Sequence, residues 1–182
     1  KTCTPISTYP TRFLRSYKPA GMKPEAGLAS GAKGWNLLVP DRVPLRILGI
    51  DPGLRALGYG VIEAVGRQAK SVDYGVIETS ADRPLHERLK TIADGLEEVI
   101  GRFHPDRMVF EKLLYCKNVS IALLLGQARG AAIVAGARHD LPMSEFNPTE
   151  IKSAIVGRGR ASKEQVQKMV QLLLSLPAIP EP

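Results

Sequence analysis

Apolar residues cluster in short runs from residue 46 onward, and the first three runs have the composition of β-strands. They cover residues 46–50, 57–65 and 70–79. A helix is predicted at 85–103, where apolar residues recur at spacings of three and four. The remaining elements are predicted as strands at 107–110 and 143–146 and helices at 120–139, 148–156 and 163–176. Three strands followed by alternating helices and strands predict an α/β fold, a mixed sheet flanked by helices.

The first 45 residues show no such pattern. Proline and glycine recur throughout them, and proline fixes φ and removes a backbone donor, so regular structure does not propagate. We therefore expect two parts, an irregular basic extension at residues 1–45 and a folded domain at residues 46–182.

The basic charge of the chain is concentrated in this extension. The net charge is +7, and residues 1–46 hold eight basic residues against two acidic ones. Such a segment favours anionic partners. Phosphate contacts are predicted for Arg12, Arg15, Lys18, Lys23 and Lys33. The composition, poor in acids and dotted with Ser and Thr, is also that of organellar targeting segments, so we expect an organellar matrix location, mitochondrial rather than plastid.

The cysteine content and the hydropathy exclude several classes of protein. With only Cys3 and Cys116, the chain has neither a disulfide framework nor the ligands of a four-coordinate zinc site. No stretch of 18 residues is free of charge, so neither a membrane-spanning helix nor a membrane partner is expected.

The most apolar segment, residues 119–137, is rich in Gly and Ala, which predicts a buried, closely packed helix. We expect Gly126 and Gly130 to permit the close packing. Arg129, between them, is expected either to be paired or to reach a phosphate.

Two acidic residues follow predicted strands, Asp51 after the first and Glu111 after the fourth. Sites in open α/β sheets form at the carboxyl ends of strands, so the two carboxylates converge if these strands are neighbours. Paired carboxylates suit Mg²⁺ or Mn²⁺, and a pair of such ions can activate water and stabilise a leaving phosphate oxygen. The alternative is that each acid merely ends a strand and faces water.

Basic residues form a run in the otherwise nearly neutral domain, and they predict phosphate binding. They are Lys152, Arg158, Arg160, Lys163 and Lys168, with Lys117 earlier in the chain. A solvated helix face is the alternative interpretation of the same run.

Four sequence strings occur in one order with compact spacing: GIDPGLRALGYGVIE, ERLKTIADGLEEVI, FEKLLYCKNVSIALLLGQARG and VGRGRASKEQVQKMVQLLLSLP. Together they closely resemble the RuvC family, the Holliday-junction resolvases of the RNase H-like nuclease superfamily, over residues 46–182. The resemblance implies an RNase H-like fold and a catalytic, metal-binding role for Asp51 and Glu111. It also implies that Lys152 and Lys163 face the junction, with Arg158 and Arg160 in the loop between them.

Three departures from the family pattern bear on catalysis. The family carries two further acids shortly after a Leu-Pro-x-Ile-Pro segment, and here the sequence reaches only Pro182 after that segment. A family aromatic residue near the junction centre is replaced by Leu114, and a family histidine by Lys168. We therefore expect these 182 residues to bind branched DNA or structured RNA without cutting it.

Two functions follow from these observations. The first is a homodimeric endonuclease that nicks four-way DNA junctions with Mg²⁺ or Mn²⁺. The second is a catalytically inactive, RuvC-like structural subunit of a large nucleoprotein, an organellar ribosome, that binds rRNA.

Overall fold

The computed structural model describes residues 43–112 and 118–179, all of which belong to one compact unit of the chain, Leu38–Pro182. Five strands and four helices alternate there in the predicted order. The strands are β1 (Leu45–Asp51), β2 (Ala56–Val65), β3 (Gln68–Glu78), β4 (Arg107–Glu111) and β5 (Met143–Phe146). The helices are α1 (Leu85–Phe103), α2 (Val119–Arg138), α3 (Pro148–Val156) and α4 (Lys163–Leu174). The sequence-based boundaries are confirmed to within two residues.

The strands form one mixed sheet in the order β3-β2-β1-β4-β5. β1, β2 and β3 pair antiparallel, whereas β4 and β5 extend the sheet from β1 in parallel. This arrangement confirms the predicted fold class.

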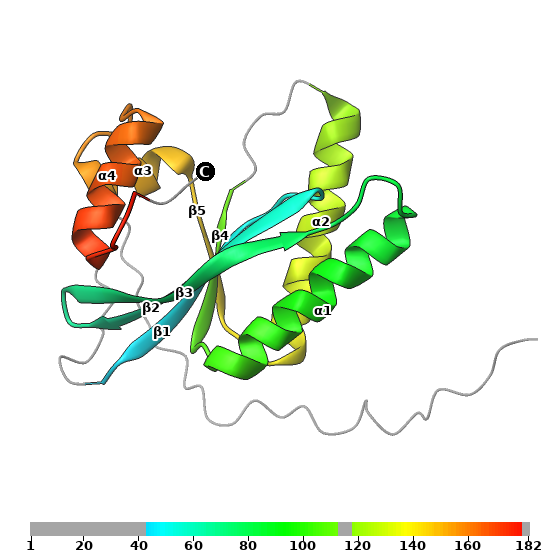
Figure 1. Ribbon diagram of the computed structural model, residues 1–182, viewed down its shortest axis with the longest axis horizontal. Coiled ribbons are helices and arrows are strands. Elements are labelled where there is room, and N and C mark those ends of the chain that lie inside the picture. Colours follow the sequence, from blue (N-terminus) through cyan, green and yellow to red (C-terminus); the bar gives the residue numbers. More distant parts are fainter. Residues whose placement is uncertain (1–42, 113–117, 180–182) are drawn as a thin grey trace, which may run out of the picture. The chain divides into compact units, whose positions relative to one another are not determined.

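Period-two alternation gives the sheet two unlike faces. On one face, here called the covered face, Leu48, Ile50, Met108 and Phe110 are buried against α1 and α2. Figure 1 shows these two helices together on one side of the sheet, with α3 and α4 as a separate pair. The opposite face, here called the open face, carries the alternate residues of the same strands.

Helix α1 is amphipathic, as its spacing predicts. Ile92, Leu96, Val99 and Ile100 are buried, and charged residues lie on the outer side.

Helix α4 begins at a capping box. The Ser162 side chain accepts a hydrogen bond from the backbone N–H of Gln165, and the Gln165 side chain accepts one from the backbone N–H of Ser162. The sequence predicts both features because each depends on residues a few positions apart.

Helix α2 differs from its prediction. Its fully buried residues are small, namely Ala128, Ala132, Ala135 and Gly136, while several of its large apolar residues are exposed. A Cβ at Gly136 would lie 2.6 Å from Met108 Sδ and 2.7 Å from Met143 Cε, so the absent side chain permits the close approach of the helix to the sheet. Gly126 and Gly130 face open space, so the expectation that they permit close packing is wrong. By length and composition α2 could cross a bilayer, but its alanine face is part of the domain core.

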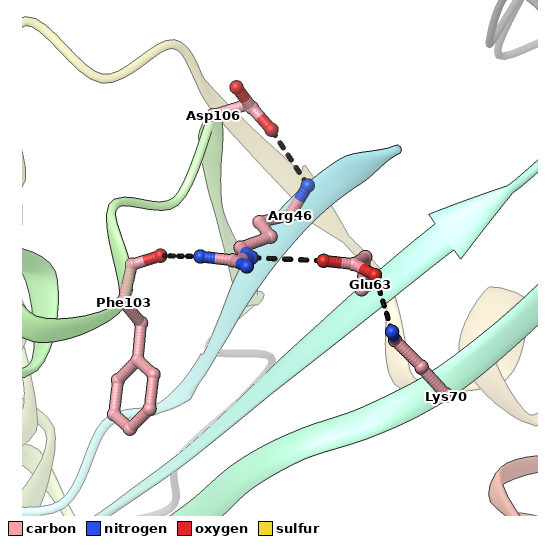
Figure 2. Close-up of polar contacts among 5 residues, drawn as sticks. All are labelled: Arg46, Glu63, Lys70, Phe103 and Asp106. Atoms are coloured by element: carbon pink, nitrogen blue, oxygen red, sulfur yellow. Dashed lines mark hydrogen bonds and ion pairs between the residues drawn. The ribbon is translucent and has the colours of Figure 1, made fainter. Parts of the chain in front are cut away.

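A charged cluster fixes the start of β1 (Figure 2). The Arg46 guanidinium donates to the Phe103 carbonyl oxygen at 2.9 Å and to Glu63 at 3.1 Å, which joins β1 to the end of α1 and to β2. The Arg46 backbone N–H donates to Asp106 at 2.7 Å, and Lys70 pairs with Glu63 at 2.6 Å. Lys70 and then Arg46 lower the pKa of Glu63. This cluster lies at the end of β1 opposite Asp51, so it sets the alignment of the strand that carries the first acid.

Candidate functional site

The sheet register brings the two predicted acids together. β1 ends at Asp51 and β4 at Glu111, and one residue earlier Ile50 pairs with Phe110 in a parallel ladder. Neighbouring strands lie about 4.8 Å apart, so the two backbones are adjacent at the carboxyl edge of the sheet. Ile50 and Phe110 point into the covered face, and Asp51 and Glu111 therefore lie on the open face.

The electrostatics confirm that these carboxylates share one environment. Burial raises the pKa of the Glu111 carboxyl, the negative charge of Asp51 raises it further, and Lys152 lowers it. The Asp51 side chain itself is exposed. Glu111 is therefore not an isolated strand end, because the charge of Asp51 acts on it.

The turn after Asp51 is fixed by residues from two other elements. Thr79 Oγ1 donates to the Leu54 carbonyl oxygen at 2.5 Å, and Arg88 of α1 donates to Thr79 Oγ1 at 3.0 Å. At Gly53 a Cβ would lie 2.2 Å from the Ala56 carbonyl oxygen, so only glycine fits this turn. No local sequence pattern points to Thr79 and Arg88, because neither residue is near Asp51 in the chain.

Arg129 of α2 lies beneath the second acid. It donates to the Glu111 carbonyl oxygen at 3.2 Å, and it forms an ion pair with Glu145 of β5. Its guanidinium also lies over the Phe110 ring, 4.8 Å from the centroid. Of the two alternatives for Arg129, the structure shows the paired one.

The predicted basic residues occupy different places. Lys152, on α3, is the one whose charge acts on Glu111. Arg158 and Arg160 are exposed between α3 and α4, and Lys163 and Lys168 are exposed on α4, where their charges act on Glu164. The remaining predicted contacts, Lys117 and the five basic residues of the extension, lie outside the described residues.

Asp51 and Glu111 fit a divalent cation as part of its ligand set. They supply carboxylate oxygens from adjacent strand ends, and burial together with the charge of Asp51 raises the pKa of Glu111, which a cation would offset. Over residues 43–112 and 118–179, no group of three or more His, Cys, Asp and Glu side chains is placed to hold a metal. The remaining ligands would therefore have to come from water, substrate or other parts of the protein.

Comparisons with known proteins identify the family of the chain. The family model for the crossover junction endodeoxyribonuclease RuvC matches residues 47–182. The RuvC endonuclease of Shewanella pealeana is 55% identical over 135 residues, which are 74% of this chain and 78% of the relative. That of Syntrophotalea carbinolica is 51% identical over 74% of this chain and 84% of the relative.

A solved structure gives the same result. Thermus thermophilus RuvC in complex with a Holliday junction substrate superposes with a TM-score of 0.73 at 34% identity, over 76% of this chain and 84% of that one. The RNase H-like architecture implied by the sequence strings is thereby confirmed.

The predicted organellar location is wrong, because the relatives at about half identity are proteins of bacteria such as Shewanella, Syntrophotalea and Desulforamulus. These relatives all carry the name of the nuclease, so the alternative of an organellar ribosomal subunit gains no support. The error has a physical origin. A basic, acid-poor, Pro-rich and Gly-rich segment is equally suited to binding nucleic acid, so composition alone does not distinguish the two uses.

Proposed function

Because the chain belongs to the RuvC family of crossover junction endodeoxyribonucleases, we propose that it binds four-way DNA junctions and holds a divalent cation for phosphodiester hydrolysis. The observation that carries this proposal is the meeting of Asp51 and Glu111 at the ends of two adjacent parallel strands. Their negative charges share one edge of the sheet, where a cation would relieve the repulsion that raises the pKa of Glu111.

In this proposal Asp51 and Glu111 bind Mg²⁺ or Mn²⁺ through carboxylate oxygens. When bound, such cations activate a water molecule and stabilise the leaving oxygen of a phosphodiester. Lys152 lies where its charge reaches Glu111, so it is placed to attract a DNA phosphate to the metal site. Because burial and the charge of Asp51 raise the pKa of Glu111, a bound cation would favour the ionised form of this carboxylate.

Basic residues of α3, α4 and the loop between them serve as phosphate contacts in the same proposal. Arg158, Arg160, Lys163 and Lys168 are exposed, as a set of backbone contacts requires. Such contacts release counterions, so the binding should weaken steeply as salt rises.

A junction assay tests the proposal. We expect the 182-residue chain to bind a four-way junction more tightly than linear duplex of the same length, with a strong salt dependence. Cleavage in Mn²⁺ should be slow at most, because within residues 43–112 and 118–179 Asp51 and Glu111 supply only part of a metal site. Any nicks should vanish in Asp51→Asn while binding persists. Equal affinity for junction and duplex, or nicks that persist in Asp51→Asn, would contradict the proposed function.

We further propose that the chain forms a homodimer through the outer face of α2. Leu123, 63% exposed, and Val134 lie on the side of this helix opposite its buried alanines. A water-exposed row of large apolar residues on a helix that is otherwise packed against a core is the pattern of a subunit interface. We infer that a second copy of the chain covers this face of α2, because two-fold symmetry would pair the same apolar face with itself.

Sedimentation analysis of two matched variants tests the dimer. Leu123→Glu should convert a dimer into a monomer, because it places a charge in the apolar interface. The control Leu172→Glu makes the same change at a residue of α4 that is 73% exposed, and it should remain dimeric. A monomeric parent chain, or a dimer that survives Leu123→Glu, would show that α2 is not the interface.

A further inference from the structure

The parallel ladder between β1 and β4 stops one residue short of the two acids. Its last pair is Ile50 with Phe110, although β1 continues to Asp51 and β4 to Glu111. In a parallel ladder, a carbonyl oxygen that faces the neighbouring strand accepts a hydrogen bond from a backbone N–H of that strand. The donor is the residue that follows the one paired with the carbonyl's own residue. Continued by one residue, the ladder would require the backbone N–H of residue 52 to donate to the Glu111 carbonyl oxygen.

Residue 52 is proline, which has no N–H to donate. The orientation of the peptide unit supports this account. The Lys112 N–H donates to the Phe146 carbonyl oxygen at 2.9 Å, toward β5. In a trans peptide the carbonyl of the same unit points the opposite way, so the Glu111 oxygen faces the β1 side, where the donor is missing.

Arg129 supplies the missing donor from the covered face. Its guanidinium donates to the Glu111 carbonyl oxygen at 3.2 Å. Its side chain is only 13% exposed, and its remaining contacts, the ion pair with Glu145 and the stacking on Phe110, hold it in place. The guanidinium of arginine is suited to this role because it presents several donors in a rigid plane.

We propose that Arg129 is the positioning residue of the second acid, replacing the backbone donor that Pro52 lacks, so that the Glu111 carboxylate stays beside Asp51. This inference rests on the proposed function, since it concerns the same metal site. Arg129 acts from beneath the sheet through the backbone of Glu111, and it contacts neither carboxylate of the pair in any hydrogen bond that the described residues make.

Mn²⁺ affinity, followed by electron paramagnetic resonance of the free ion, tests the inference together with the melting temperature. Arg129→Gln should weaken Mn²⁺ binding about tenfold, the loss typical when a residue supporting a metal ligand is removed. The matched control is Arg138→Gln, which removes another ion pair of α2, that with Glu97 at 2.6 Å, far along the helix from Glu111. This control should change Mn²⁺ affinity less than about twofold.

A rescue variant separates positioning from a general effect on folding. Pro52→Ala restores a backbone N–H at residue 52, so the Pro52→Ala/Arg129→Gln double variant should recover most of the lost Mn²⁺ affinity. Arg129→Lys keeps the charge and most of the packing, and its affinity should lie between those of the parent and Arg129→Gln. If Arg129→Gln does not fold, Arg129→Lys and its combination with Pro52→Ala carry the same comparison.

The outcomes distinguish this inference from the proposed function. If Asp51→Asn leaves Mn²⁺ binding unchanged, the metal site itself is wrong. If Asp51→Asn abolishes binding but Arg129→Gln and Arg129→Lys retain the parent affinity, the positioning role of Arg129 is wrong. Failure of Pro52→Ala to restore affinity to the weakened variants would also overturn it, because the restored donor reaches only the backbone of Glu111.

Discussion

The covered and open faces of the sheet are built from the same strands, yet they carry opposite kinds of residue. Ile50 and Phe110 are buried beneath α1 and α2, and the residues that follow them, Asp51 and Glu111, lie on the open face. The open face also carries Tyr74, whose register partner Gly60 pairs in turn with Gly49. Consecutive residues of one strand therefore differ in their role, since one is buried in the core and the next lies at the proposed metal site.

This comparison also explains how a polar site is held in place. Each acid is fixed by contacts made from the helix-bearing side of the molecule, since Arg88 of α1 supports the turn after Asp51 and Arg129 of α2 supports Glu111.

The largest change in the free energy of unfolding is expected for a substitution on the covered face. Phe110→Ala should lower the free energy of unfolding by about 3–5 kcal/mol, because Phe110 is 1% exposed and its loss leaves a cavity. Chemical denaturation measures this change. The matched control is Tyr74→Ala, which removes an aromatic ring that is 58% exposed on the open face and should cost no more than about 0.5 kcal/mol. Similar losses in the two variants would show that the faces do not differ as described.

A smaller change in the free energy of unfolding, of opposite sign, is expected when Glu111, the residue after Phe110, is substituted. Burial and then Asp51 raise the pKa of Glu111 above its unfolded value, so the folded state is weakened as pH rises through that pKa. Glu111→Gln should therefore stabilise the domain at neutral pH, by about 0.5 kcal/mol after allowance for partial exposure. Thermal melting at neutral and acidic pH checks the sign, since the advantage should vanish at acidic pH, where the parent Glu111 is protonated in both states.

The effect of Mg²⁺ on the melting temperature tests the open face further. A cation that binds only the folded state stabilises it, so Mg²⁺ should raise the melting temperature of the parent chain and not that of Glu111→Gln. An equal rise in both would mean that the cation binds elsewhere.

Local sequence patterns were sufficient for much of this molecule. Apolar runs, helical spacing and capping signals placed all nine described elements, because each of these signals is a property of a few neighbouring residues. The convergence of Asp51 with Glu111 was predictable only if their two strands are neighbours, since parallel strands end at the same edge of a sheet. The observed sheet order meets this condition. The strings around these acids carried the family resemblance that the comparisons confirm.

Other features were decided only by the tertiary structure. Gly136, rather than Gly126 or Gly130, allows the close approach of α2 to the sheet, because the two methionines that it meets come from β4 and β5. The apolar composition of α2 predicted a buried helix, but one helix presents only part of its circumference to a sheet, so several of its large residues remain exposed.

The contacts that hold Asp51 and Glu111 in position were also decided by the tertiary structure. Within the sequence, Asp51 and Glu111 are visible because their residue type and their position at strand ends are local properties. The roles of Arg129, Thr79 and Arg88 are not visible, because each depends on a contact with a backbone carbonyl from another element. The sequence by itself therefore determined which residues are proposed to carry the chemistry, and only the packing of helices against the sheet decided which residues hold them in position.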